Sequence, residues 1–360
     1  MASDLARHKH LLATLIAALA VLAGTLGGAD AAQAHGSRLT GKGGIASRVA
    51  VDRAVSARAA RSKSELPGAG GKVYLGATVG AAVYGEKSNP PWNMTPLETF
   101  EAHSGHSVAI LQVHQDWGSI YPDVLRKIHS RGAVPMLVTE YDNLRRVVNG
   151  SQDAQIKAMN AALNAYGGPV LFRWDWEMNG DWYPWGGRGQ AKEWVAAYRH
   201  LHDRLTAPNV SWIWNPNVYD PNYMTAPGAS ADPALWYPGD AYVDWMGADG
   251  YSYGTETFAK VFGPTYRLFQ ELAPDKPIIL PEWAASDRAG RKAAYISEAF
   301  AQVPTAFPAI KAMVYYNDVL GSGKEWPLEN SAAAESAYRA GSARPAFAAT
   351  PNTAGKLAVP

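Results

Sequence analysis

Short apolar runs recur along most of the chain, and segments with helical periodicity separate them. These runs are rich in β-branched residues and are Val73–Val79, Val108–Val113, Val134–Thr139, Val170–Arg173, Val210–Trp214, Val243–Ala248, Pro277–Leu280 and Ile310–Tyr315. Apolar side chains recur at helical spacing over residues 151–166, 190–205 and 288–303. Strands that alternate with helices are typical of parallel α/β folds. Eight candidate strands predict a single closed (β/α)8 barrel, also known as a TIM barrel.

The N-terminal part of the chain has a different pattern. A basic start at Arg7–His10 precedes an apolar run from Leu11 to about Leu26, and Ala32-Gln33-Ala34 follows. This order predicts a secretory signal peptide over residues 1–34, cut after Ala34. An uncut membrane anchor is the alternative, but the run is short for a spanning helix and rich in Ala and Gly.

Two further segments lack the barrel pattern. Residues 35–71 consist mainly of Ala, Gly, Ser and Arg with few large apolar side chains. Such a segment buries too little surface to offset its ordering entropy, so we expect a disordered basic linker. The catalytic barrel domain is then expected over residues 72–348, and a flexible tail over residues 349–360.

Composition narrows the class of protein. Lys and Arg number 33 against 32 Asp and Glu, and the basic excess lies in residues 1–71. The barrel region is therefore mildly acidic, and we expect no nucleic-acid partner. The chain has no cysteine, and His114 with Asp116 is a weak metal signal, so we expect neither metal nor cofactor. We also expect a monomer without stable membrane association. Thirteen Trp and 18 Tyr against 8 Phe suit ligand grooves.

Two predicted strands end in a carboxylate among aromatic residues. After the fourth strand, the chain continues from Arg173 through Trp176 to Glu177. Soon after the seventh strand come Glu282 and Trp283. Residues that follow the strands of such a barrel meet at one face, where active sites of this fold lie. Burying a glutamate costs free energy, so a residue that served only to stabilise the fold would not be expected to be a glutamate here. Two such glutamates suit double displacement at a glycosidic bond, one as an acid with a raised pKa and one as an ionised nucleophile.

These segments resemble glycoside hydrolase family 26, a family of retaining (β/α)8 glycosidases best known for endo-β-mannanases. The family pattern at strand four is Arg, two residues, His, Glu, Met, Asn or Thr, and Gly, with tryptophans downstream. The matching residues here are Arg173, Glu177, Met178, Asn179, Gly180 and Trp182. The resemblance covers most of residues 72–330. It implies that Glu177 is the general acid/base and Glu282 the nucleophile.

One position departs from the family pattern. Trp176 stands where the family has His, a residue that the resemblance places at the −1 sugar subsite. If Trp176 reaches the subsite, it changes selectivity among mannose, glucose and xylose, whose 2-hydroxyls differ. If strand alternation persists, Trp176 turns outward, opposite to Glu177. We favour contact with the subsite because the strand ends here.

Other residues near the predicted strand ends are candidates for substrate binding. They are Arg173, Asn179, Trp182, Trp185, Asn215, Tyr251, Trp283 and Trp326. Arg173 either orients a catalytic carboxylate or neutralises Asp175 as a buried pair. The resemblance implies that Tyr251 hydrogen-bonds the nucleophile, with Tyr253 as the second candidate. Any of the tryptophans can instead be a packing residue. Glu140 also follows a strand, but it lacks the aromatic surroundings.

The sequence therefore predicts a secreted, retaining endo-β-glycosidase that acts on a plant-type polysaccharide. β-1,4-Mannan is the first choice, because mannanases dominate the family that the chain resembles. Mixed-linkage β-glucan and β-1,3-xylan are the alternatives within that family. A non-catalytic carbohydrate-binding barrel is the alternative of a different class, and the two strand-end carboxylates argue against it.

Overall fold

Eight parallel strands close into a barrel in chain order, with β8 pairing back to β1. The computed structural model describes residues 72–221, 230–319 and 325–348. The strands are β1 (Tyr74–Val79), β2 (Ile110–His114), β3 (Val134–Thr139), β4 (Val170–Trp174), β5 (Val210–Trp214), β6 (Trp245–Ser252), β7 (Ile278–Ala285) and β8 (Ile310–Asn317). Each overlaps one of the predicted runs, so the predicted (β/α)8 barrel is confirmed.

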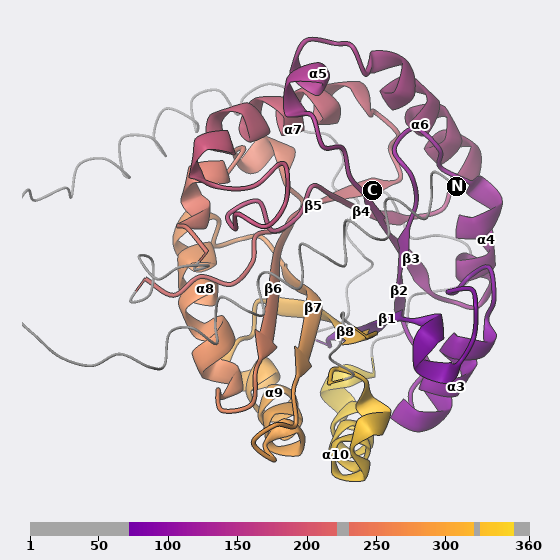
Figure 1. Cartoon of the computed structure of the whole chain (residues 1–360), viewed down its shortest axis with the longest axis vertical. Helices are drawn as coiled ribbons and strands as arrows, with labels where there is room; N and C mark the ends of the chain where they lie inside the picture. The colour runs from indigo at the N-terminus through magenta and orange to yellow at the C-terminus, as the bar shows by residue number, and fades with distance from the viewer. Residues whose placement is uncertain (1–71, 222–229, 320–324, 349–360) are drawn as a thin grey trace, which may run out of the picture.

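Helices surround this ring of strands (Figure 1). They are α3 (Thr95–Ser104), α4 (Pro122–Ser130), α5 (Leu144–Val148), α6 (Asp153–Tyr166), α7 (Ala191–Arg204), α8 (Phe258–Leu272), α9 (Lys292–Ala306) and α10 (Ala332–Ser342). Short 3-10 turns are η2 (Ala81–Tyr84), η3 (Arg188–Gln190), η4 (Pro233–Trp236), η5 (Asp240–Tyr242), η6 (Leu328–Asn330) and η7 (Pro345–Phe347). The helix predicted from residue 288 begins only at Lys292, because Gly290, at φ 67°, lies in a turn whose N–H bonds to the Asp287 carbonyl.

Strands β6 and β7 run further toward the carboxyl end than the apolar pattern predicts. The predicted runs end at Ala248 and Leu280, whereas the strands continue to Ser252 and Ala285. Both contain register shifts, one of them between Gly247 and Asp249. The extensions carry polar residues that bond to one another inside the barrel, which hydropathy alone does not detect. Tyr251 and Glu282 consequently lie within strands rather than in loops.

The core has two layers. The smaller one contains residues that alternate with outward-facing positions along the strands and fill the barrel: Tyr74, Ala109, Ile110, Val134, Met136, Leu171, Ile213, Trp245, Ile279, Ala312 and Val314. The larger one packs the outer face of the strands against the helices. The filled interior supports the polar residues at the carboxyl ends of the strands from below.

Several predictions concern residues outside the described ranges. The signal peptide of residues 1–34, the linker of residues 35–71 and the tail of residues 349–360 all lie there. Among the helices of the described ranges, none combines the length and the apolar character that crossing a membrane requires.

Truncating a side chain inside the barrel tests this packing. Met136 in β3 has no exposed surface. Met136→Ala should lower the free energy of unfolding by about 2–5 kcal/mol, through lost burial and a residual cavity. Val148→Ala, at a position that is 38% exposed, should change it by less than about 0.5 kcal/mol. Urea unfolding followed by circular dichroism measures both, and equal effects would contradict the two-layer core.

Candidate active site

The carboxyl ends of the strands bring together residues that are distant in sequence. Arg173 comes from β4, Tyr251 from β6 and Glu282 from β7. All three are hydrogen-bonded into one cluster. Glu177 follows β4 and lies close enough to Glu282 for their charges to interact.

Glu282 is a buried carboxylate surrounded by donors. Arg173 Nη1 donates to its Oε1 at 2.6 Å, and the Tyr251 hydroxyl donates to its Oε2 at 2.5 Å. Gln112 Nε2 donates to Oε1 at 3.4 Å. Burial raises the pKa of Glu282, but the Arg173 charge and the hydrogen bonds from Tyr251 and Arg173 outweigh burial and hold that pKa below its ordinary value. Glu282 is therefore ionised at neutral pH, as a nucleophile must be.

Arg173 of β4 contacts residues of three other strands through a single buried guanidinium. It forms ion pairs with Glu282 and with Asp249 of β6, and Nη1 also donates to Gln112 Oε1 at 3.0 Å. Its partner is not Asp175, the alternative raised by the sequence. Asp175 has φ 41°, and its Oδ1 accepts the Tyr141 backbone N–H at 2.8 Å. The backbone turn at the end of β4 directs Asp175 to this neighbouring loop, so Arg173 orients Glu282 and does not pair with Asp175.

Glu177 sits on a sharp backbone turn. Its φ is 53°, in the left-handed region that residues other than glycine seldom adopt. Its backbone N–H donates to the Asn215 carbonyl at 2.7 Å, which ties the turn to the end of β5. The alternation of inward- and outward-facing side chains along β4 therefore ends before Glu177, the predicted acid/base.

Two loop residues hold the Glu177 carboxyl. Asn217 Nδ2 donates to Oε1 at 2.6 Å, and Trp182 Nε1 donates to Oε2 at 2.8 Å. Burial and the nearby charge of Glu282 raise the pKa of Glu177 to about 7, although both donors lower it. Glu177 therefore carries a proton over a pH range in which Glu282 does not. The environments of the two glutamates separate their pKa values, as an acid and nucleophile pair requires.

Gly180 in the strand-four motif has a steric role. A Cβ at this position would lie 2.3 Å from Cη2 of the Trp182 ring. The absence of a side chain lets the indole lie flat over the backbone and reach Glu177. The glycine of the motif thus allows the donor to approach the acid/base.

Trp176 turns toward the site rather than away from it. Its ring lies 4.9 Å from the Arg173 guanidinium and 5.7 Å from the His114 ring. Its ring also lies 5.3 Å from the Tyr183 ring in an edge-to-face arrangement. Because β4 has already ended at Trp174, strand parity no longer directs the side chain outward.

Two predicted binding residues, Trp283 and Trp185, are packing residues instead. Trp283 has no exposed surface and lies against Tyr295 and Phe300 of α9. As the neighbour of Glu282 in β7 it must face the opposite side of the sheet, so its predicted role in substrate binding is wrong. Trp185 is buried too, and its Nε1 donates to the Trp176 carbonyl at 2.8 Å.

Asn179 uses its side chain to hold a loop. Its Oδ1 accepts the Asn217 N–H at 2.8 Å, and its Nδ2 donates to the carbonyls of Asn217 at 2.9 Å and Ala231 at 3.1 Å. The side chain is buried, and both N–H donors and one acceptor site of the amide are used within the protein, which corrects the predicted binding role. By holding Asn217, Asn179 places the amide that donates to Glu177.

The remaining predicted residues lie around the two glutamates. Trp182 is half-buried and bonds to Glu177. Asn215 is buried, and its carbonyl accepts the Glu177 N–H. Trp326, after β8, lies 4.8 Å from the ring of Tyr251.

Sequence reasoning assigned no role to two residues of this cluster. Gln112 lies within the apolar run of β2, and Asp249 lies within β6. Each is a polar residue near the carboxyl end of a barrel strand, which is the signal that could have identified them. Within the described ranges, no group of three or more His, Asp or Glu side chains could hold a metal ion.

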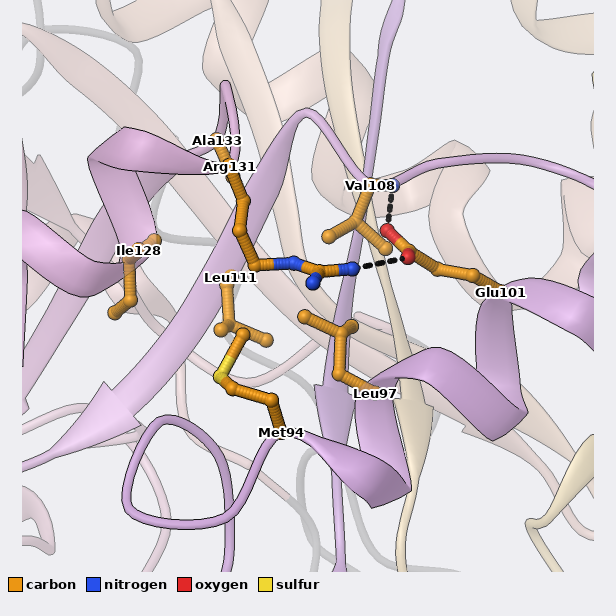
Figure 2. A pocket seen from close by; sticks show the side chains of 8 residues that line it. All are labelled: Met94, Leu97, Glu101, Val108, Leu111, Ile128, Arg131 and Ala133. Atoms are coloured by element: carbon orange, nitrogen blue, oxygen red, sulfur yellow. Dashed lines mark hydrogen bonds and ion pairs between the residues drawn. The ribbon is translucent and has the colours of Figure 1, made fainter.

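A separate small pocket lies outside the barrel, between α3, β2 and α4 (Figure 2). Most of its lining is apolar, including Leu97, Leu111 and Ile128. Arg131 and Glu101 form an ion pair at 2.9 Å along its edge. It contains none of the residues of the glutamate cluster, so it offers no competing active site.

Comparison with known proteins agrees with this geometry. The family model of glycosyl hydrolase family 26 matches residues 135–280, a span that includes Glu177 and ends just before Glu282. Endoglucanase H of Acetivibrio thermocellus is 30% identical over 274 residues, which are 69% of this chain and 29% of that protein. β-1,3-Xylanase TXYA of a Vibrio species is 33% identical over 108 residues, 29% of this chain and 21% of that protein. The chain spans less than a third of the length of these curated relatives.

Solved structures share the fold. A β-mannanase of Bacteroides ovatus superposes with a TM-score of 0.56 at 15% sequence identity. The match covers 80% of this chain and 93% of that one. At this identity the likeness concerns the barrel alone.

Removing one donor from Glu177 tests the electrostatic account. Trp182→Phe keeps an aromatic ring but deletes the N–H that favours the ionised carboxyl. The pKa of Glu177, about 7 in the unaltered protein, should rise. Carboxyl 13C NMR measures it, with Glu177→Gln assigning the resonance. Trp92→Phe, at a 52% exposed tryptophan, is the matched control and should leave the pKa unchanged. A lower pKa in Trp182→Phe would contradict the assigned role.

Proposed function

The chain belongs to glycosyl hydrolase family 26, and from this premise we propose that it is a retaining endo-β-glycosidase that hydrolyses a polysaccharide by double displacement. The observation that carries the proposal is the opposite shift of the pKa values of two buried glutamates. Arg173 and Tyr251 hold Glu282 ionised, whereas burial and the charge of Glu282 keep Glu177 protonated. A protein that only bound carbohydrate would not need one ionised and one proton-carrying glutamate at the same site.

In the proposed first step, Glu282 attacks the anomeric carbon while Glu177 gives its proton to the departing glycosidic oxygen. The carbon–oxygen bond to the leaving sugar breaks, and an ester bond to Glu282 forms. In the second step Glu177 takes a proton from water, which attacks the same carbon and releases Glu282. Two inversions give a product with the original β configuration.

The coupling between the glutamates supports this sequence of roles. The charge of Glu282 raises the pKa of Glu177. Once Glu282 has become an ester, that charge is absent and the pKa of Glu177 falls. The Glu282 charge already diminishes while the ester forms, which favours the transfer of the Glu177 proton to the leaving group in the same step. Glu177 then remains ionised and serves as the base in the second step. No cofactor takes part in either step.

For the polysaccharide we propose a β-glucan, with mannan as the alternative. Trp176 supports this choice, because it presents a broad apolar ring beside Arg173 where the family has an imidazole, and an indole has no acceptor nitrogen. A sugar with an axial 2-hydroxyl, such as mannose, therefore lacks the polar partner of the family pattern. The similarity to a protein named endoglucanase over 69% of this chain points the same way.

We propose in addition that the protein is secreted and acts as a monomer. Secretion rests on the signal peptide predicted over residues 1–34. The monomer rests on the site, since the groups proposed for both steps come from one chain.

Exchange of the two glutamates for alanine tests the mechanism. Glu282→Ala should abolish turnover on every substrate, with kcat falling by about 10⁴-fold or more. Glu177→Ala should retain an initial burst with aryl glycosides of acidic phenols, and azide should accelerate the slow second step. Glu140→Ala, the control at the third strand-end carboxylate, should remain active. A Glu282→Ala enzyme above about a tenth of normal activity would refute the nucleophile assignment.

The selectivity prediction concerns Trp176. Trp176→His restores the family residue and should shift the ratio of kcat/KM values toward mannan by about fivefold or more, equivalent to about 1 kcal/mol. Reducing-sugar release from mannan and from barley β-glucan, measured side by side, gives this ratio. Trp92→His is the control at an exposed tryptophan. An unchanged ratio in folded Trp176→His would remove Trp176 from the subsite and leave mannan as the better proposal.

A further inference from the structure

Lys292 is a buried cation that the two-step scheme does not use. It lies in the first turn of α9, and its side chain has no exposed surface. Nζ donates to three consecutive carbonyl oxygens, those of Glu325 at 2.9 Å, Trp326 at 3.0 Å and Pro327 at 2.5 Å. Since an ammonium group has three N–H donors, every donor of Lys292 is used on this one segment.

The segment held by Lys292 leads directly to the nucleophile. It follows β8 and carries Trp326, whose ring lies 4.8 Å from that of Tyr251. Tyr251 in turn donates to Glu282 Oε2 at 2.5 Å. A second bond fixes the same point, because the Tyr315 hydroxyl donates to the Trp326 carbonyl at 3.0 Å. Lys292 thus stands at one end of a continuous series of contacts that ends on Glu282.

We propose that Lys292 is a positioning residue that holds Trp326 against Tyr251 and so keeps the Tyr251 hydroxyl on Glu282. The effect on catalysis rests on the proposed function, in which Glu282 is the nucleophile. The effect on Trp326 rests on the contacts alone. A neutral side chain at this position would leave three carbonyls without their shared donor, and the segment could then move away from Tyr251.

The ammonium form is present at neutral pH. Burial lowers the pKa of Lys292 to about 8, against the charges of Asp287, Glu329 and Glu325, which raise it. Below that pH all three donors are available. Lys292 contacts Glu282 only through Trp326 and Tyr251, and the helix that carries it, α9, belongs to the ring of helices around the strands (Figure 1).

Lys276 provides a matched control. It too uses its ammonium group on backbone carbonyls, those of Asp240 at 2.9 Å and Val243 at 2.6 Å. These carbonyls precede β6, and Lys276 precedes β7, so this contact lies at the amino ends of the strands, opposite the site. Lys276→Met and Lys292→Met therefore delete the same chemistry at opposite ends of the barrel.

The first test is the pH profile of kcat/KM. Losing the Tyr251 hydrogen bond raises the pKa of Glu282, so Lys292→Met should move the acid limb up by about one pH unit. Tyr251→Phe should move it similarly, and the double variant should shift no further. Lys276→Met should leave the limb in place. The other charged or titratable groups around Glu282 are unchanged in all these variants: Arg173, Glu177, Asp249, His114, Asp318, Tyr183 and Tyr316.

The second test does not depend on turnover. In protein labelled with 5-fluorotryptophan, the 19F resonance of Trp326 is assigned with Trp326→Phe. Lys292→Met should shift or broaden this resonance, and Lys276→Met should not. An unmoved resonance together with an unmoved acid limb overturns the proposal. If the unaltered protein hydrolyses no polysaccharide, the proposed function fails, whereas the 19F result still decides whether Lys292 positions Trp326.

A second variant covers the case in which Lys292→Met does not fold. Lys292→Arg keeps the charge, but its longer planar group cannot place three donors on adjacent carbonyls in the same way. It should shift the acid limb in the same direction by a smaller amount and perturb the Trp326 resonance. A native resonance with a native acid limb in Lys292→Arg, at normal thermal stability, also overturns the proposal.

Discussion

One buried guanidinium organises the carboxyl end of the barrel. Arg173 in β4 pairs with Asp249 in β6 and with Glu282 in β7, and it bonds to Gln112 in β2. A buried carboxylate is stable only when it is paired and hydrogen-bonded, and one cation here serves two of them. The same charge helps to outweigh burial at Glu282 and keeps it ionised, whereas at Glu177 it only partly offsets burial and the Glu282 charge, so the pKa of Glu177 rises. Arg173 hydrogen-bonds directly to Glu282, whereas the donors to Glu177 are the neutral side chains of Asn217 and Trp182, and this difference in partners separates the two glutamates chemically.

The sequence predicts the barrel well because its signal is repetitive. Each apolar run reports a strand, and the order of runs and helices fixes the topology. The Glu177 segment and Glu282 were recognisable because a carboxylate among aromatic residues at a strand end is unusual. The alternation of side chains along β7 explains why the prediction for Glu282 agrees with the structure and the one for Trp283 does not. Glu282 faces the barrel interior, so Trp283, its neighbour, must face the helices. Around β7 the sequence left open which face of the sheet each residue takes.

Partners from distant segments were beyond local sequence reasoning. Asp249 pairs with Arg173 across 76 residues, and Asn217 reaches Glu177 across 40. No spacing rule links such positions, because the closure of the barrel brings them together. The turn at Asp175 and Glu177 was also unforeseen, since positive φ values are rare for these residue types. That turn decides that Trp176 points to the site and that Asp175 does not pair with Arg173.

The two glutamates are supported by different kinds of structure. Glu282 is held by side chains of β2, β4 and β6, all within the sheet, whereas Glu177 is held by Asn217 and Trp182 from the loops after β5 and β4. Loops open locally at a lower free energy than the strands of a barrel. Gradual warming would therefore disturb Glu177, the proposed proton donor, before Glu282, the proposed nucleophile. An ageing or heated sample would lose the ability to cleave poor leaving groups while it still reacted with good ones. For the same reason the loops after β4 and β5 can diverge during evolution without dismantling the nucleophile.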